Sequence, residues 1–526
     1  MEKTPQHILI RGVNWIGDAV LTIPAIRSVR RAFPDARICL LVKPWVADIF
    51  RENPDIDEIV LYDKSFIGLS GKLRLAKKLR QKKFDVAILL QNAFDAALIA
   101  WLARIPRRIG YRRDGRGFLL SQAVPVSDKV LEKHQVYYYL DLLACAGIKP
   151  SDPHPYLYLT DGERQRAKDL LSSYFSDTGA LLIGINPGAT YGSAKRWPPG
   201  RFAELIIRII SELGGQVILF GGPSEVEITD EIIREINKLK IQMKIERLGA
   251  RILIMAGKTS LRELAALIAA CDAFITNDSG PMHMASALRV PTAAIFGSTD
   301  QTATGPFGEG HQVIAKDIPC APCMKRECPE GHLKCMMEIT TDDVYSALRE
   351  ILPGQRAVFL DKDGTLIEDR NYLNSFDDLH ILRGVKTALK RLKEAGFRLI
   401  GATNQSGVAR GIVDESFVSE SNDYLRKELL LDDFYYCPHH PDEKCPCRKP
   451  EPLMLLRARL QHRISLKASY VIGDKESDVM LAVKTGATGI LLSATPLFEK
   501  SAASYISKDL PGAVTWILER EKNRKE

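Results

Sequence analysis

The sequence predicts an α/β protein made of two Rossmann-like lobes, each with a doubly wound parallel sheet, and a third Rossmann-like α/β domain behind them. Apolar segments of strand length alternate with amphipathic helical segments from the N-terminus onward, a pattern typical of parallel sheets. This alternation starts afresh near residue 180 and again at residue 357. We therefore expect three domains, at 1–165, 166–352 and 355–526.

The composition is that of an ordinary globular protein, because 45% of the 526 residues are hydrophobic and 26% are charged. No apolar run approaches the roughly 18 residues that cross a bilayer, and the N-terminus lacks the apolar region of a signal peptide. We therefore expect a cytoplasmic protein. The net charge of +8 suits phosphorylated substrates or peripheral contact with the anionic inner face of the membrane, and it is too diffuse to indicate nucleic-acid binding.

The first lobe opens with a strand at 7–11, a loop at 12–18 and a helix at 19–33. Two loop glycines have the spacing of a phosphate-binding loop, but Asp18 stands where such a loop needs Lys and Ser or Thr. This difference argues against a nucleoside triphosphate site. An Asp at the start of a helix either caps the helix, which is its commoner use, or serves as a general base in a cleft.

Two basic segments accompany the remaining strands of this lobe. The segment 72–83 is an amphipathic helix whose charges indicate a solvated face or a membrane-surface role. The segment 104–113, together with Arg116, is typical of a loop, and its arginines suit either capture of phosphate groups or an ordinary surface. The strands are expected at 36–42, 58–61 and 84–90.

The second lobe restarts with a strand at 180–186 that runs into the loop 187–198. Glycines in this loop let a ligand approach the backbone, and Lys195 supplies a cation, so the loop suits a diphosphate bound without metal. After the strand at 216–220, Glu225 is placed either to accept the two hydroxyls of a ribose or to cap the next helix.

A strand at 273–277 ends in Asp278, Ser279 and Gly280, which open the following helix. Backbone amides at a helix N-terminus form a ready anion site. We expect the ligands to lie between the two lobes.

Four stretches of this region, at 11–34, 186–198, 264–283 and 320–326, resemble the lipopolysaccharide heptosyltransferase II family. Members of that family are metal-independent, inverting glycosyltransferases of the GT-B type, with an acceptor lobe followed by a donor lobe. The resemblance covers nearly all of 1–350. It implies that Asp18 is the catalytic base and not a helix cap. It implies that ADP-heptose is the donor and a heptose of the lipid A-core the acceptor, with no cofactor. The residues implied for donor binding are Lys195, Glu225 at the ribose, Asp278, Ser279 and Gly280.

Four cysteines with loose spacing lie near the end of the second lobe, at Cys320, Cys323, Cys328 and Cys335. With His332 they could ligate zinc or an iron-sulfur cluster. No second closely spaced pair is present, and the resemblance assigns no metal to this segment. We therefore expect reduced thiols in a loop.

The third domain begins with an apolar strand at 357–360 that ends in Asp361, Asp363 and Gly364. Two carboxylates at i and i+2 can converge on one point at the carboxyl edge of a sheet. The alternative, a calcium loop, needs its Gly at the sixth position, whereas this Gly falls at the fourth.

Further polar groups follow later strands of this domain. A strand at 397–402 leads into Thr403 and Asn404, and a strand at 470–472 leads into Asp474 and Asp478. With Lys449 they provide what a phosphomonoester requires, namely a carboxylate nucleophile, a hydroxyl and an ammonium for the phosphoryl oxygens, and carboxylates for Mg²⁺.

This order of motifs resembles the haloacid dehalogenase phosphatases. The resemblance implies that Asp361 attacks phosphorus to form an aspartyl-phosphate, while Asp363 protonates the leaving oxygen and later activates water. Thr403 and Lys449 would hold the phosphoryl group, with Asn404 near the substrate. Mg²⁺ would be bound by Asp361, the carbonyl of Asp363 and Asp474, with Asp478 supporting that shell.

Between these motifs stands the strongest metal-binding pattern of the chain, C-x-H-x5-C-x-C, formed by Cys437, His439, Cys445 and Cys447. Four such ligands suit a closed tetrahedral zinc site, and a loop of plain thiols is the alternative. Because Arg448 and Lys449 follow directly, zinc would fix the loop that carries the lysine and would be structural.

Over 356–495 the motifs are similar to the heptose 1,7-bisphosphate 7-phosphatases, with Arg448 expected at the distal phosphate. Histidinol phosphatases share these motifs, so an alternative is another sugar transferase fused to such a phosphatase. A further alternative is a non-catalytic sugar-nucleotide sensor. The heptosyltransferase resemblance of the first two lobes favours heptose, and the presence of Asp18, Asp361 and Asp363 argues against a sensor.

Overall fold

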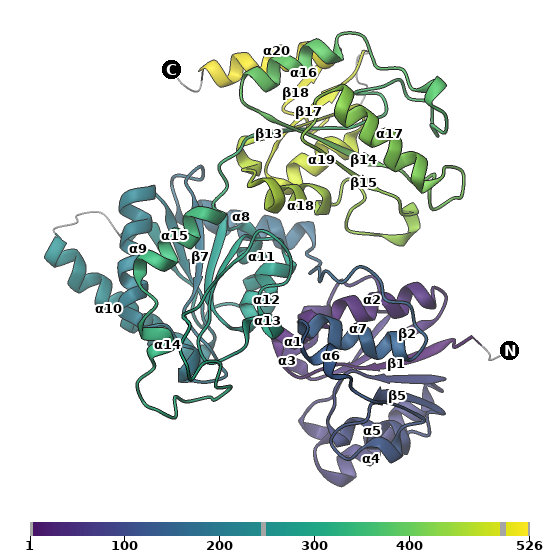
Figure 1. Ribbon diagram of the computed structural model, residues 1–526, viewed down its shortest axis with the longest axis vertical. Coiled ribbons are helices and arrows are strands. Elements are labelled where there is room, and N and C mark those ends of the chain that lie inside the picture. The colour runs from purple at the N-terminus through teal and green to yellow at the C-terminus, as the bar shows by residue number, and fades with distance from the viewer. Residues whose placement is uncertain (1–3, 244–248, 495–500, 524–526) are drawn as a thin grey trace. The chain divides into compact units, whose positions relative to one another are not determined.

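The computed structural model describes residues 4–243, 249–494 and 501–523, and the chain forms two compact units, Met1–Ile351 and Leu352–Glu526 (Figure 1). Unit 1 contains two six-stranded sheets and unit 2 contains one. Neighbouring strands are parallel in all three sheets. The α/β fold class predicted from the sequence is therefore confirmed.

The three sheets have the same strand order, which is the order of the dinucleotide-binding Rossmann fold. The first is β3-β2-β1-β4-β5-β6, with β1 (His7–Arg11), β2 (Arg37–Val42), β3 (Glu58–Leu61), β4 (Val86–Leu89), β5 (Arg107–Tyr111) and β6 (Gln122–Val124). The second is β9-β8-β7-β10-β11-β12, with β7 (Leu182–Asn186), β8 (Gln216–Leu219), β9 (Ile252–Ile254), β10 (Ala273–Asn277), β11 (Thr292–Ile295) and β12 (Gln312–Ile314). The third is β15-β14-β13-β16-β17-β18, with β13 (Ala357–Leu360), β14 (Arg398–Asn404), β15 (Asp433–Cys437), β16 (Tyr470–Gly473), β17 (Thr488–Leu492) and β18 (Tyr505–Ser507).

Helices cover both faces of the first sheet, because successive residues of β1 are buried on opposite sides. Ile8 and Ile10 pack in one core with residues of α1, α2 and α7, whereas Leu9 packs in a second core with residues of α4 and α5. The α-helices of this lobe are α1 (Ile16–Leu21), α2 (Ile23–Ala32), α3 (Pro44–Ala47), α4 (Gly68–Gln81), α5 (Phe94–Leu102), α6 (Asp128–Leu131) and α7 (Gln135–Cys145).

The second lobe has its helices at α8 (Asp161–Tyr174), α9 (Pro199–Leu213), α10 (Val226–Met243), α11 (Leu261–Ala270), α12 (Gly280–Ala287), α13 (Gln301–Thr304), α14 (Lys334–Met337) and α15 (Thr341–Ile351). Within this lobe, Arg262 of α11 forms an ion pair with Glu163 of α8 and contacts both of its carboxylate oxygens, at 2.6 and 2.7 Å. Arg262 also donates to the carbonyl of Asp48 in the first lobe, at 3.4 Å.

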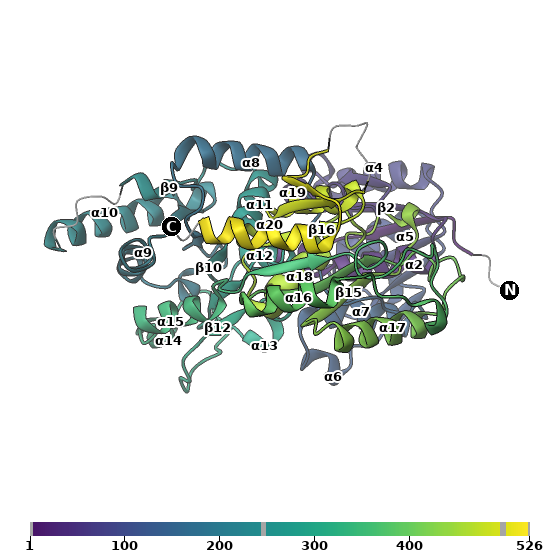
Figure 2. The same cartoon turned by 90° about the horizontal axis from the view of Figure 1, so that it is seen from above.

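A hydrophobic core of unit 2 joins β13 and β16 to α16 and α20. These two helices run side by side in both views (Figures 1 and 2). Its helices are α16 (Val385–Glu394), α17 (Glu415–Glu428), α18 (Leu453–His462), α19 (Glu476–Thr485) and α20 (Leu510–Asn523).

Two secondary-structure predictions were wrong. The helix expected at 19–33 begins earlier, at Ile16, and is divided at Thr22, because Pro24 lacks the N–H that a continuous helix would need. The loop expected at 104–113 contains β5, whose apolar residues complete the sheet core. In addition, β14 extends two residues beyond the expected strand and includes Thr403 and Asn404.

Candidate active sites

Asp18 lies in the first turn of α1, which follows β1 at the carboxyl edge of the first sheet. Trp15 is the N-cap residue, and no side chain makes a capping hydrogen bond at this described helix end. The commoner role considered for Asp18, a helix cap, is therefore not the one seen.

Two glycines let α1 pack closely against α12 of the second lobe. A Cβ added at Gly17 would lie 2.6 Å from the ring of His283, and one added at Gly280 would lie 3.0 Å from the side chain of Ile16. Because real Cβ atoms are not found that close, larger residues would separate the two helices and move Asp18 away from the second lobe.

The second lobe presents a buried charge pair to this cleft. Lys195, which follows β7, forms an ion pair with Asp278, which follows β10. Thr299 Oγ1 donates a hydrogen bond of 2.6 Å to the same Asp278 oxygen, Oδ2. The ammonium also lies 4.5 Å from the ring centre of Tyr191. These contacts hold Lys195 in one position beside Asp278.

Burial raises the pKa of Asp18 to about 6, and the remaining influences come from the charge pair of the second lobe. The Lys195 ammonium lowers this pKa, whereas the Asp278 carboxylate raises it. A carboxylate with a pKa near neutrality can accept a proton from a hydroxyl group more readily than an ordinary surface carboxylate.

Glu225 is buried beside the loop that carries Lys195. A Cβ added at Gly188 would lie 2.1 Å from its carboxylate carbon, so Gly188 is required for this contact. Glu225 Oε2 accepts a hydrogen bond of 2.8 Å from the Gly222 N–H, which is the capping role considered from the sequence. Oε1 has no hydrogen-bond partner among the described residues and remains available to a ligand.

Ser279 and Gly280 open α12 as expected, but Ser279 Oγ makes no capping bond there. It instead lies 2.9 Å from Thr276 Oγ1 and accepts a bond of 3.4 Å from Asn186 Nδ2. Next to it, His283 is buried, and burial lowers its pKa to about 4, so the imidazole is neutral at physiological pH. Sequence reasoning assigned no role to either Thr299 or His283. His283 lies in the stretch 264–283 that carries the family resemblance, whereas Thr299 stands in no chemically distinctive pattern.

The arginines proposed to capture phosphate are partly used inside the first lobe. Arg116 is buried and donates to the carbonyls of Tyr111 and Gln91. Arg108 donates to the Leu119 carbonyl at 2.6 Å. Arg108 and Arg116 therefore satisfy backbone carbonyls and are not free to bind a ligand.

In unit 2, Asp361 follows β13 and meets a buried lysine. Lys449 Nζ lies 2.7 Å from Asp361 Oδ1 and 2.6 Å from Asp478 Oδ1, and it donates to the Ala402 carbonyl at 2.8 Å. Burial opposes the charge on Lys449, but the two carboxylates outweigh it and raise its pKa. The lysine is therefore a fixed cation beside the nucleophile candidate.

Three carboxylates, from Asp361, Asp474 and Asp478, come within 4.8 Å of one another and could hold a cation. Asp474 Oδ1 is buried without a hydrogen-bond partner among the described residues, so a cation would satisfy it. Gly364 has φ +80°, and a Cβ there would lie 2.5 Å from Asp474 Oδ2. Both the positive φ angle and the lack of room for a Cβ therefore require glycine at this position. The oxygen-rich donor set fits Mg²⁺.

Asp363 lies outside this carboxylate group and has a separate environment. Burial raises its pKa, and its Oδ2 accepts a hydrogen bond of 2.9 Å from Gln405 Nε2. The same Gln405 nitrogen lies 3.1 Å from Thr403 Oγ1, so one amide orients both groups. Gln405 was not singled out from the sequence.

Asn404 makes two hydrogen bonds to the backbone of Lys449. Its Oδ1 accepts from the Lys449 N–H at 3.0 Å, and its Nδ2 donates to the Lys449 carbonyl at 3.2 Å. Asn404 therefore positions the lysine. Beside it, the Arg448 Nη1 is buried without a hydrogen-bond partner among the described residues, as expected for a group that awaits an anion.

Cys437, His439, Cys445 and Cys447 form the second candidate metal group, with their ligand atoms within 4.8 Å of one another. The Cys437 and Cys445 sulfurs are 3.4 Å apart, and His439 Nδ1 lies 3.2 Å from Cys447 Sγ. A tetrahedral zinc site with bonds of about 2.3 Å has edges of roughly 3.8 Å, so small adjustments would admit the ion. In the other cysteine segment, Cys320 Sγ lies 4.0 Å from His332 Nε2, and Cys328 Sγ accepts the Leu333 N–H.

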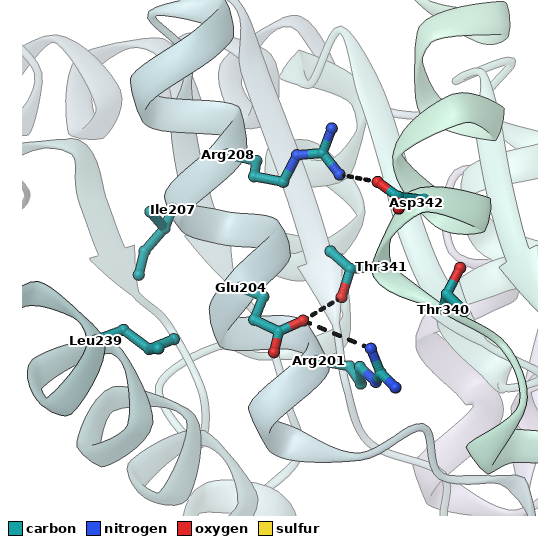
Figure 3. A pocket seen from close by; sticks show the side chains of 8 residues that line it. All are labelled: Arg201, Glu204, Ile207, Arg208, Leu239, Thr340, Thr341 and Asp342. Carbon is teal, nitrogen blue, oxygen red and sulfur yellow. Dashed lines mark hydrogen bonds and ion pairs between the residues drawn. The ribbon is translucent and has the colours of Figure 1, made fainter. Parts of the chain in front are cut away.

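A hollow of about 380 Å³ lies between α9, α10 and the start of α15, away from all of these groups (Figure 3). Its charged residues are paired, since Arg208 contacts Asp342 at 2.5 Å and Thr341 donates to Glu204 at 2.5 Å. This hollow therefore offers no unpaired charge of the kind found at Arg448.

Residues 72–334 match the family model of glycosyltransferase family 9 (heptosyltransferase), and residues 446–495 match the model of HAD-hydrolase-like proteins. The chain is 32% identical over 351 residues to lipopolysaccharide heptosyltransferase 2 of Salmonella typhimurium, covering 66% of this chain and 98% of the relative. It is 38% identical over 170 residues to the D-glycero-beta-D-manno-heptose-1,7-bisphosphate 7-phosphatase of Helicobacter pylori, covering 31% of this chain and 97% of the relative. The solved structure of ADP-heptose LPS heptosyltransferase II from E. coli is similar with a TM-score of 0.55 and 30% identity, covering 66% of this chain and 98% of that chain.

No helix in the described residues has the length and apolarity to span a membrane.

Proposed function

Because this chain belongs to glycosyltransferase family 9, the heptosyltransferase family, and carries a HAD-type hydrolase unit, we propose that it is a bifunctional enzyme of lipopolysaccharide heptose metabolism. Unit 1 transfers heptose from ADP-heptose to a heptose of the lipid A-core, with inversion. Residues 1–165 form the acceptor lobe and 166–352 the donor lobe. The observation that supports this most is Asp18, whose raised pKa is set partly by a charge pair on the opposite lobe.

In this reaction Asp18 removes the proton from the acceptor hydroxyl, whose oxygen attacks the anomeric carbon as the bond to ADP breaks. Lys195 stabilises the negative charge that develops on the departing diphosphate, and Asp278 with Thr299 holds Lys195 in place. The N–H groups at Ser279 and Gly280 add to this anion site, while Glu225 Oε1 accepts a ribose hydroxyl. No metal is needed in this arrangement.

The transferase test is formation of ADP and heptosylated acceptor, followed by mass spectrometry. Asp18→Asn should lower kcat by roughly 10²- to 10⁴-fold, the usual contribution of a positioned base. Thermal unfolding of unit 1 is the folding control, and phosphatase activity of the same variant shows that unit 2 is intact. Retention of more than about a tenth of kcat would contradict the assignment of the base.

Unit 2, with its phosphatase domain at 355–526, removes the 7-phosphate of D-glycero-D-manno-heptose 1,7-bisphosphate and leaves the 1-phosphate. Asp361 attacks phosphorus and becomes an aspartyl-phosphate, while Asp363 protonates the leaving oxygen and then activates the water that hydrolyses the intermediate. Lys449 and Thr403 hold the phosphoryl oxygens. Arg448 binds the distal phosphate, so that one end of the substrate reaches Asp361.

Two metal ions accompany this unit. Mg²⁺ fits Asp361, Asp474 and the Asp363 carbonyl, and it would supply charge neutralisation for the phosphoryl group. Asp478 supports that site through its contact with Lys449. Zinc fits the Cys437, His439, Cys445 and Cys447 group and fixes the loop that leads to Arg448 and Lys449.

The phosphatase test offers heptose 1,7-bisphosphate and histidinol phosphate and follows the products by phosphorus NMR. Asp361→Asn should remove activity, and Arg448→Ala should weaken selectivity for the bisphosphate more than it slows simple phosphomonoesters. A preference for histidinol phosphate, or release of the anomeric phosphate first, would refute the proposed substrate. Because the acceptor of unit 1 is a lipid, we also place the enzyme at the inner face of the membrane as a peripheral protein.

A further inference from the structure

Several large apolar side chains are exposed on the first lobe, close to where strands of its sheet end. Ile67 and Leu69, which follow β3, are 63% and 69% exposed. Phe94, which follows β4, is 42% exposed, and Phe118, which follows β5, is 76% exposed. Because the strands are parallel, all of them end at the same edge of the sheet, which is also the edge that carries Asp18 after β1.

Three of these residues lie at the start of a helix, Ile67 and Leu69 at α4 and Phe94 at α5. Helices α4 and α5 pack against each other on the same face of the sheet (Figure 1). Phe94 at the start of α5 also meets Phe118, with ring centres 6.2 Å apart. Leu73, in the second turn of α4, extends the surface, with an exposed fraction of 49%. We call Ile67, Leu69, Leu73, Phe94 and Phe118 the apolar surface.

The composition of α5 is unusual for a helix at a protein surface. Of its nine residues, FDAALIAWL, only Asp95 is polar. Asp95 accepts a hydrogen bond of 3.1 Å from the Tyr62 hydroxyl. A surface helix normally presents polar residues to water, so the exposed side of α5 suits contact with an apolar medium.

Basic residues accompany the apolar surface. Segment 64–74, at the start of α4, contains Lys64, Lys72 and Arg74 and no Asp or Glu. Lys64, Arg112 and Arg113 are exposed at the same edge of the sheet. Arg112 lies against Gly117, beside Phe118. A mixture of exposed aromatic and aliphatic side chains with Lys and Arg is complementary to an anionic bilayer surface, where the rings enter the interface and the cations meet phosphate.

We propose that the apolar surface docks unit 1 on an anionic phospholipid bilayer, with the Asp18 edge of the sheet toward the lipid. This inference rests on the proposed function, because it explains how the core sugar of a membrane-anchored acceptor reaches the cleft while its acyl chains stay in the bilayer. The contact is interfacial and does not span the membrane.

The test measures co-sedimentation of the full chain with vesicles of phosphatidylcholine, with and without about one third phosphatidylglycerol. Wild-type protein should bind the anionic vesicles and should lose affinity at high salt. The double variant Ile67→Ser, Phe118→Ser should bind roughly tenfold more weakly. The matched control is Leu170→Ser, Ile241→Ser, which removes two exposed side chains of the second lobe and should bind as wild type does.

Transferase assays separate this inference from the proposed function. On a deacylated, water-soluble acceptor the Ile67→Ser, Phe118→Ser variant should match wild type, whereas on acceptor in anionic vesicles its kcat/KM should fall about tenfold. The docking proposal would be refuted if the wild-type protein bound neutral and anionic vesicles equally, or if the double variant bound vesicles as well as wild type. It would also be refuted if the protein formed a dimer without vesicles and the double variant abolished that dimer. Vesicle binding that depends on the apolar surface, without transfer to the soluble acceptor, would support docking and refute the transferase assignment.

Discussion

The transferase should lose activity in mild acid, with a midpoint set by Asp18. A general base acts in its deprotonated form, and the pKa of Asp18 is about 6. About nine tenths of Asp18 is ionised at pH 7 and about one tenth at pH 5, so kcat/KM should fall roughly tenfold between these values.

Two substitutions should move this midpoint in opposite directions. The Lys195 ammonium lowers the pKa of Asp18 and the Asp278 carboxylate raises it. Lys195→Met should therefore shift the acidic limb to higher pH, and Asp278→Asn should shift it to lower pH, each by roughly one unit or more. Both variants should also lower the plateau of kcat/KM, because both residues belong to the proposed donor site.

The assay is the pH profile of kcat/KM from pH 4.5 to pH 8, with thermal unfolding of unit 1 in the same preparations as the folding control. A flat wild-type profile would refute Asp18 as the titrating base. Shifts of both variants in the same direction would refute the electrostatic coupling between the lobes.

Three further predictions concern positions outside the nucleophile and base. Asn404→Ala removes two hydrogen bonds to the Lys449 backbone and should lower phosphatase kcat about 10- to 100-fold with unchanged transferase activity, measured on one preparation. Cys445→Ser should reduce zinc from one equivalent per chain to a small fraction by elemental analysis, and it should lower the thermal midpoint of unit 2. Arg262→Ala leaves a buried Glu163 carboxylate unpaired and should cost about 3–5 kcal/mol of unfolding free energy by denaturant titration. Burial works against ionisation of Glu163, but Arg262 holds the pKa of this carboxyl at about 2. The ion pair therefore contributes its full share of the unfolding free energy above about pH 4.5, and this contribution is lost as the pH falls toward 2.

Each of these predictions has a matched control in the same chain. If Asn404→Ala lowered the phosphatase and the transferase activities together, this would contradict the role of Asn404 in positioning Lys449. Cys145→Ser removes an exposed thiol and should leave zinc at one equivalent, whereas a zinc-free wild type would show that the loop is held by packing alone. Arg208→Ala breaks a more exposed ion pair and should cost only about 0–1 kcal/mol, so an equal loss for Arg262→Ala would contradict the burial argument.

Much of the fold was predictable because strand segments in a buried parallel sheet are short, apolar and bounded by polar turns. The strands at 7–11, 58–61 and 357–360 were confirmed with the same bounds. The segment 104–113 was misjudged because its five arginines conceal the apolar residues of β5. Nothing local shows that Arg108 and Arg116 turn inward to backbone carbonyls, since that depends on chain segments that meet only in the folded lobe.

The residues of the candidate sites likewise divide into those that the sequence could identify and those that it could not. Asp18, Asp278 and Asp361 could be singled out because each follows a predicted strand, where open sheets place their chemistry. Thr299 and Gln405 could not, because their importance comes from a single hydrogen bond to a residue more than 20 positions away in the chain. The role of Asn404 also changed, since its amide turned out to hold the backbone that carries Lys449. The zinc and magnesium ligands remain predictions that metal analysis will test.

The strand order of the three sheets has a consequence for biosynthesis. Each sheet is assembled from six strands that are consecutive in the chain, with none borrowed from another sheet. Every strand of the first sheet has therefore been translated before any strand of the second, and likewise for the second and third. Domains generally fold as units from the N-terminus while synthesis proceeds at about 5–20 residues per second. The ribosome thus takes roughly 9–35 seconds to make the 175 residues of unit 2, which gives unit 1 time to fold before the phosphatase strands are complete.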